Sequence, residues 1–109
     1  MDNDVLINRE DFLTMVEPFK RFARRKRVED AVLSMVDGDL VISLPGVSSG
    51  APVTGNWSGE VRVPWRFVVA LAMVPPAGDP IQVMVRESRL HVGTLSINMV
   101  VKKGRRSLI

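Results

Sequence analysis

The sequence has no cysteine, only one histidine and no apolar run long enough to cross a membrane. The absence of cysteine excludes disulfides, thiolate metal sites and cysteine nucleophiles, and it fits a reducing compartment. The longest uncharged apolar run, residues 67–76, is too short for a bilayer, and the acidic N-terminus does not resemble a signal peptide. We therefore expect a cytoplasmic protein that does not enter a membrane.

Groups that could carry catalysis are scarce. His91 lies in an alternating strand pattern with no second histidine or cysteine as a partner, so we predict that it is a surface or interface residue. The sequence contains no glycine-rich phosphate loop and no serine nucleophile motif. Its paired acids fit helix starts and turns: Glu10–Asp11, Glu29–Asp30 and Asp37 with Asp39. We expect no enzyme activity, no cofactor, no metal and no small-molecule substrate.

What is present is the composition of one globular domain. The chain has 109 residues, of which 46% are hydrophobic and 25% are charged, and this balance allows a core to form. The net charge is only +3, but ten of the fifteen cations lie in two short segments, residues 20–27 and 102–106. A polyanion would meet these two segments first, because the region between them is slightly acidic.

Residues 4–27 predict a short strand followed by an amphipathic helix. Asn8 is a good N-cap, and Glu10 and Asp11 in the first turn favour a helix start. Pro18 removes one helical hydrogen bond, so we predict a kink or a split near Val16. At about 100° per residue, the helix has an apolar face and a cationic face. The apolar face holds Phe12, Val16, Phe19 and Ala23. The cationic face holds Arg21, Arg24 and Arg25.

After Arg27 the hydrophobic period changes to two, which indicates strands. Residues 31–36 and 40–44, joined by a turn at Asp37–Asp39, predict a hairpin. The stretch Pro45–Pro52 is rich in glycine and serine and predicts a loop, and Val53–Trp57 predicts a third short strand.

From Glu60 the same order of elements begins again. A strand, a helix and three strands are predicted over residues 61–63, 65–74, 81–86, 90–92 and 95–101. Apolar positions of the two halves match at offsets of 56, 55 and 50, as in Val5 with Val61, Phe12 with Phe67, and Leu33 with Val83.

These elements predict an α+β fold made of two βαβββ repeats, over about residues 4–58 and 60–101. Neither repeat can bury a helix and a sheet face alone, so we predict two helices packed on one face of a shared antiparallel sheet. The single domain then spans residues 1–101, and residues 102–109 form a basic tail.

Several stretches of the chain resemble a single domain of the bacterial sliding clamp, the processivity ring of DNA polymerase III. They are Val5–Leu13 (VLINREDFL), Val36–Ile42 (VDGDLVI), Val61–Phe67 (VRVPWRF) and Leu71–Pro75 (LAMVP), which leads into Ile81–Val83. These motifs are structural and say little about activity. The resemblance implies helices that face a DNA-filled channel and edge strands that pair between neighbouring domains. A full ring has six domains, so this chain would assemble as a homohexamer or act without encircling DNA.

A dense group of cations at the end of the first helix is the main candidate binding site. Several cations on one surface bind phosphates in a salt-sensitive way that does not depend on base sequence. The alternatives are a solvated helix end and an amphipathic helix lying on anionic lipid. We predict contact with the backbone of double-stranded DNA through Lys20, Arg21, Arg24, Arg25 and Arg27, with Lys26 in the same run.

The second predicted helix is apolar on all sides, because Arg66 is its only charged residue. Either the first helix covers more of it than an amphipathic pattern implies, or its surplus apolar face binds a second copy. We predict self-association into a homo-oligomer through Trp65, Val68, Val69, Ala72 and Met73.

Two functions follow from these features. The first is a stand-alone, non-enzymatic clamp-like domain that self-associates and contacts the DNA backbone. The second is a protein–protein adaptor or assembly scaffold that does not bind DNA, in which the apolar helix and the free sheet edges are the working surfaces.

Overall fold

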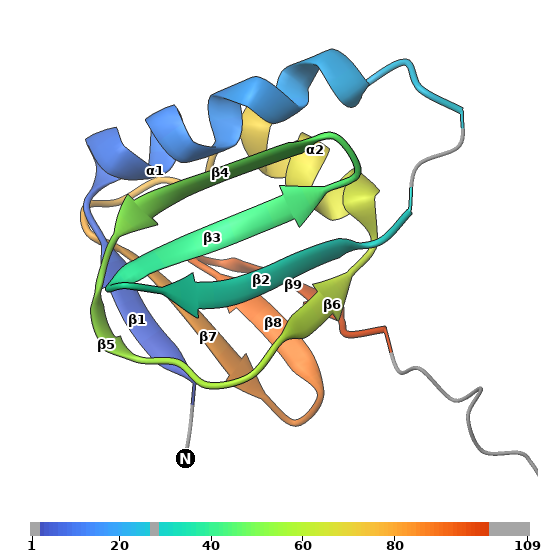
Figure 1. Cartoon of the computed structure of the whole chain (residues 1–109). Coiled ribbons are helices and arrows are strands. Elements are labelled where there is room, and N and C mark those ends of the chain that lie inside the picture. The colour runs from blue at the N-terminus through green and yellow to red at the C-terminus, as the bar shows by residue number, and fades with distance from the viewer. Residues whose placement is uncertain (1–2, 27–28, 101–109) are drawn as a thin grey trace, which may run out of the picture.

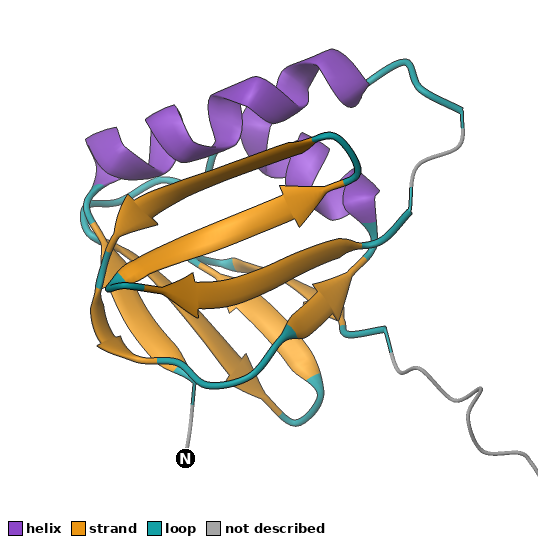
Figure 2. Ribbon diagram, in the orientation of Figure 1, coloured by secondary structure: helices purple, strands orange, loops and turns teal. Residues whose placement is uncertain are grey.

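The computed structural model describes residues 3–26 and 29–100, which form two antiparallel sheets and a layer of helices (Figures 1 and 2). The helices are α1 (Arg9–Val16), the 3₁₀ helix η1 (Glu17–Phe22) and α2 (Trp65–Met73). The strands are β1 (Asp4–Ile7), β2 (Ala31–Val36), β3 (Asp39–Leu44), β4 (Val47–Pro52), β5 (Thr54–Asn56), β6 (Val61–Val63), β7 (Ile81–Arg86), β8 (Arg89–Val92) and β9 (Leu95–Asn98). The predicted α+β class is confirmed.

The first helix begins and ends where the sequence predicts. The side chain of Asn8 accepts a hydrogen bond from the Asp11 N–H at 2.8 Å, which satisfies one of the free amides of the first turn. α1 ends at Val16, and Pro18 lies in the first turn of η1. Because proline has no N–H, the α-helical hydrogen-bond ladder cannot continue through this point. The predicted split near Val16 is confirmed.

The strands form two sheets, and the prediction of one shared sheet is wrong. One sheet has the order β5–β1–β7–β8–β9, and the other has the order β4–β3–β2–β6 (Figure 1). β1 pairs with β7 from the second half of the chain, and β6 pairs with β2 from the first half. Hydrophobic alternation shows which side of a strand is buried, but it does not show which strand lies beside it.

The two exchanged pairs have corresponding registers. Val5 lies opposite Val83 in one sheet, and Val61 lies opposite Leu33 in the other. The hairpin turns correspond as well, because the two residues that follow β2 and the two that follow β7 all have positive φ, as tight two-residue turns require. These correspondences occur at the offsets of 56 and 50 residues seen in the sequence.

The segment Pro45–Pro52 contains a strand, so the predicted loop is wrong. β4 pairs along its whole length with β3. A Cβ on Gly50 would lie 2.9 Å from Cγ2 of Val41, so the small residues that resemble a loop signal allow this strand to approach its neighbour closely. The chain then crosses to the other sheet, where the predicted strand Val53–Trp57 is shortened to β5.

The core lies between the two sheets and the helices. Figure 1 shows α1 and η1 running over the sheets with α2 beside them. Phe12, Val16 and Phe19 are buried as predicted. Ala23 is exposed and Phe22 is buried in its place. This difference arises because η1 has three residues per turn, so Phe22 follows Phe19 on the buried face. Within residues 3–26 and 29–100, no helix is long and apolar enough to span a membrane.

Candidate nucleic-acid interface

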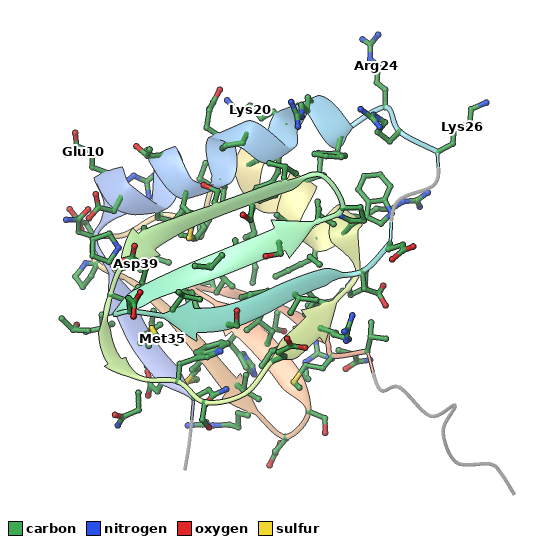
Figure 3. The ribbon with its side chains drawn as sticks, viewed as in Figure 1. Glu10, Lys20, Arg24, Lys26, Met35 and Asp39 are labelled. Carbon is green, nitrogen blue, oxygen red and sulfur yellow. The ribbon has the colours of Figure 1, made fainter. Side chains whose placement is uncertain are left out.

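The predicted cations gather at the end of η1 and in the residues that follow it. Five of them lie in the described part of the chain, and all five are exposed. Figure 3 shows Arg24 and Lys26 projecting away from the body of the fold. Arg27 and the basic tail at residues 102–109 lie outside the described residues. We call the five exposed cations the basic cluster: Lys20, Arg21, Arg24, Arg25 and Lys26.

Phe22 anchors this cluster to the core. Its side chain is buried, and its ring centroid lies 6.4 Å from that of Phe19. The guanidinium carbons of Arg21 and Arg25 lie 5.4 and 5.1 Å from the same ring centroid, within the range of cation–π attraction. The backbone N–H of Arg25 also donates to the carbonyl of Phe22 at 3.0 Å. Two of the arginines are therefore held beside a buried ring while their charges remain exposed.

Few acids oppose the basic cluster. Among the described residues, its one ion pair joins Lys20 Nζ to Glu17 Oε1 at 3.1 Å, and a pair so exposed contributes little stability. Glu10 lies in the first turn of α1, and Figure 3 shows it at the opposite end of the helical segment. Charge is thus sorted along α1 and η1, with an acidic start and a strongly positive end.

The second helix does not present the predicted self-association surface. Val68, Val69 and Ala72 are at most 7% exposed and belong to the core, so they cannot meet a second copy unless the fold opens. Val68 lies beside Phe12 of α1 and beside apolar residues of both sheets, and both α1 and η1 pack against α2. Trp65 is half-buried, and of the five predicted residues Met73 alone is largely exposed, at 55%.

Arg89 on β8 forms a hydrogen-bonded arrangement that the sequence did not predict. Arg89 donates through Nη1 to Asn98 Oδ1 at 2.6 Å and through Nη2 to Ser96 Oγ at 2.8 Å. Arg86 lies directly opposite Arg89 in the β7–β8 pair. The signal is present in the sequence as two arginines flanking the turn residues Glu87–Ser88, because such a turn places its flanking residues opposite each other.

The described residues line more than one open groove. One of about 440 Å³ is lined by residues that include Ser58, Glu60 and Glu87. A groove of about 350 Å³ beside the start of α1 is lined by one carboxylate and no histidine or serine: Leu6, Asn8, Asp11, Pro52, Val53, Thr54 and Pro80. No three histidine, aspartate or glutamate side chains lie together as a metal site would need, within the same described ranges. His91 is half-buried on β8, opposite Ser96 and Met84.

Comparison with models of known protein families gives no match, and comparison with characterised proteins gives no significant match. The functional proposal therefore depends on the residues of this chain and their geometry.

Proposed function

We propose that this chain forms a non-enzymatic clamp-like domain that contacts the DNA backbone through the basic cluster without reading base sequence. The observation that carries the proposal is the exposed positive surface at the end of η1, where, among the described residues, one of the five cations, Lys20, is paired with an acid. Such a surface neutralises phosphates and releases counterions, which gives affinity independent of base sequence.

The arrangement of elements supports the clamp-like part of the proposal. The order of one strand, one helix and three strands occurs twice, with β5 between the two sets. The corresponding registers of Val5 with Val83 and Val61 with Leu33 agree with two related βαβββ units that exchange their first strands. α2 differs from a helix that faces a DNA-filled channel, because Arg66 is its single charged residue. The guanidinium carbon of Arg66 lies 5.5 Å from the centroid of the Trp65 ring. DNA contact is therefore assigned to the η1 side alone.

Self-association is the second part of the proposal. β4 and β9 are edge strands, and neither contains a charged residue. The third uncharged edge strand, β5, has only three residues, Thr54–Asn56. Natural proteins commonly protect exposed edges with charges, so these uncharged edges favour pairing between copies, as the clamp resemblance implies. The apolar side chains Met73 and Val74, at 55% and 72% exposed, add a further surface at the end of α2.

Fluorescence anisotropy with a labelled random DNA duplex tests the DNA contact. We expect micromolar or tighter binding at low salt, with a slope of log K against log salt of about −4 for a cluster of this size. Absence of binding at low salt would reject the DNA contact. Light scattering tests self-association separately: a hexamer supports a ring, a dimer supports a different use of the same edges, and a strict monomer rejects self-association.

A protein adaptor without DNA binding is the second candidate. It is favoured by the exposed Met73 and Val74 and by the uncharged edge strands β4, β5 and β9, which fit protein partners better than phosphates. The two candidates are distinguished by the anisotropy measurement, because an adaptor of this kind leaves the duplex unbound at every salt concentration.

Removing the acid beside the basic cluster should strengthen DNA binding. We expect Glu17→Gln to tighten duplex binding about twofold at low salt, because it releases Lys20 from the pair at 3.1 Å and an exposed pair of this kind is worth only about 0.5 kcal/mol. Glu10→Gln, which removes the same charge at the other end of the helical segment, is the matched control. A larger gain in Glu10→Gln would contradict the assignment of binding to the η1 end.

A further inference from the structure

The edge strand β9 presents backbone groups without a ladder partner. It pairs with β8 and with no other strand among the described residues. Met99 N–H donates to the Ser88 carbonyl at 2.9 Å, and alternate residues of an antiparallel strand bond to the same neighbour. Leu95 and Ile97 therefore bond toward β8, whereas the N–H and C=O groups of Ser96 and Asn98 face the other side. Beyond the end of β9, β6 reaches that side, because the Val100 N–H donates to the Arg62 carbonyl at 2.8 Å, so the open edge consists of Ser96 and Asn98.

The same two residues hold an arginine over this edge. The side chains of Ser96 and Asn98 accept the hydrogen bonds of Arg89 at 2.8 and 2.6 Å, so the guanidinium is drawn from β8 across β9. Leu90 and Val92, the alternate residues of β8, are buried, so the arginine lies on the outer face of the sheet. Two of its five N–H donors are used, and three remain for a ligand.

No carboxylate balances this charge within the described residues, where the salt bridges involve Lys20 and Arg62 instead. Arg86 lies directly opposite Arg89, and like charges in directly opposite positions destabilise a strand pair. Neutral acceptors, Ser96 and Asn98, restrain Arg89 without reducing its charge. An ordered and unbalanced guanidinium of this kind is suited to an anion such as a carboxylate.

We infer that the open edge of β9 binds an extended, acidic segment of a partner protein, with Arg89 selecting a carboxylate on the added strand. A strand added at this edge bonds to the backbone of Ser96 and Asn98. The side chains directly opposite these two residues lie on the same face, with Cβ atoms about 5 Å away. A glutamate there reaches the guanidinium of Arg89, in the mode by which extended peptides extend a sheet.

A second copy of this chain matches the edge less well. The other uncharged edge strands, β4 and β5, have the sequences VSSGAP and TGN and contain no acid. Their backbones could pair with β9 but would leave Arg89 without an anion. An acidic segment and a second copy would exclude each other at β9. A bound acidic segment would therefore prevent a second copy from pairing at β9 and would limit self-association. This role goes beyond the proposed function.

The test is an NMR titration of the full chain with two peptides of about eight residues, one alternating valine with glutamate and one alternating valine with glutamine. We expect the glutamate peptide to shift the amide signals of Ser96 and Asn98 saturably. We expect the glutamine peptide to bind about tenfold more weakly, because a hydrogen bond to a charged group is lost. In Arg89→Gln the two peptides should bind equally weakly, whereas Arg66→Gln, which removes the same charge on α2, should behave as wild type.

A second variant separates the position of the arginine from its charge. Replacing both Ser96 and Asn98 with alanine keeps the charge but frees the guanidinium, and we expect glutamate-peptide binding about threefold weaker. The proposal is overturned by equal affinity of the two peptides for the wild type, by shifts confined to the basic cluster, or by no saturable shift up to about 1 mM peptide. It is also overturned if random duplex DNA shifts Ser96 and Asn98 and the glutamate peptide does not.

Discussion

Replacing Arg21, Arg24 and Arg25 together with glutamine is expected to weaken duplex DNA binding about a hundredfold at low salt. The three guanidiniums are exposed and carry no salt bridge within the described part of the chain. Each phosphate contact that is lost contributes about 1 kcal/mol, and the three together reduce the salt slope by about three. Anisotropy titrations at several salt concentrations measure both the affinity and the slope.

A second triple variant controls for net charge. Replacing Arg62, Arg66 and Arg86 with glutamine removes the same charge from β6, α2 and β7, outside the basic cluster, and we expect duplex affinity within about threefold of wild type. Equal losses in the two triple variants would mean that net charge governs binding. Unchanged affinity in the first variant would reject the basic cluster as the DNA contact.

Phe19→Ala is expected to lower the free energy of unfolding by about 3–5 kcal/mol. Phe19 is 0% exposed, stands next to Phe22, and belongs to the segment η1 that packs against α2. Truncating its ring removes apolar burial and leaves a cavity where the helical segments meet. Because small domains are stable by only about 5–15 kcal/mol, urea unfolding followed by circular dichroism should show a large shift in the midpoint.

Leu13→Ala is the matched comparison for this effect. Leu13 lies on α1 and is 37% exposed, so its truncation should cost less than about 1 kcal/mol. Similar midpoints for the two variants would contradict the placement of Phe19 in the core. A Phe19→Ala protein that binds DNA less well only because it unfolds should recover its affinity at low temperature, where the fold persists.

Local chemistry made most of the elements predictable. Three of these features depend only on residues close to them in the chain: the N-cap at Asn8, the end of α1 before Pro18 and the strand at residues 31–36. The two hairpin turns are likewise set by short segments, even where Glu87 and Ser88 take positive φ without glycine. These features depend on steric and hydrogen-bonding preferences of neighbouring residues, which a single sequence displays directly.

Elements that depend on distant partners were the ones that sequence patterns missed. β4 has little apolar alternation, and it becomes a strand because β3 supplies the hydrogen bonds and Gly50 allows close approach. Val68, Val69 and Ala72 were predicted to form a surplus apolar face, yet they are buried in the core, where the sheets, α1 and η1 pack around α2. Neither outcome follows from residue types alone, since burial depends on what packs against a segment.

By itself, the sequence determined the secondary structure of most of the chain, the position of the charges and the apolar residues of the core. Only the tertiary structure decided that the strands divide into two sheets, which edges remain open and where Arg89 lies over β9. The physical reason is that charge and hydrophobic period belong to the residues themselves. Strand pairing uses backbone groups that nearly every residue shares, and its outcome is therefore settled by the packing of the whole fold.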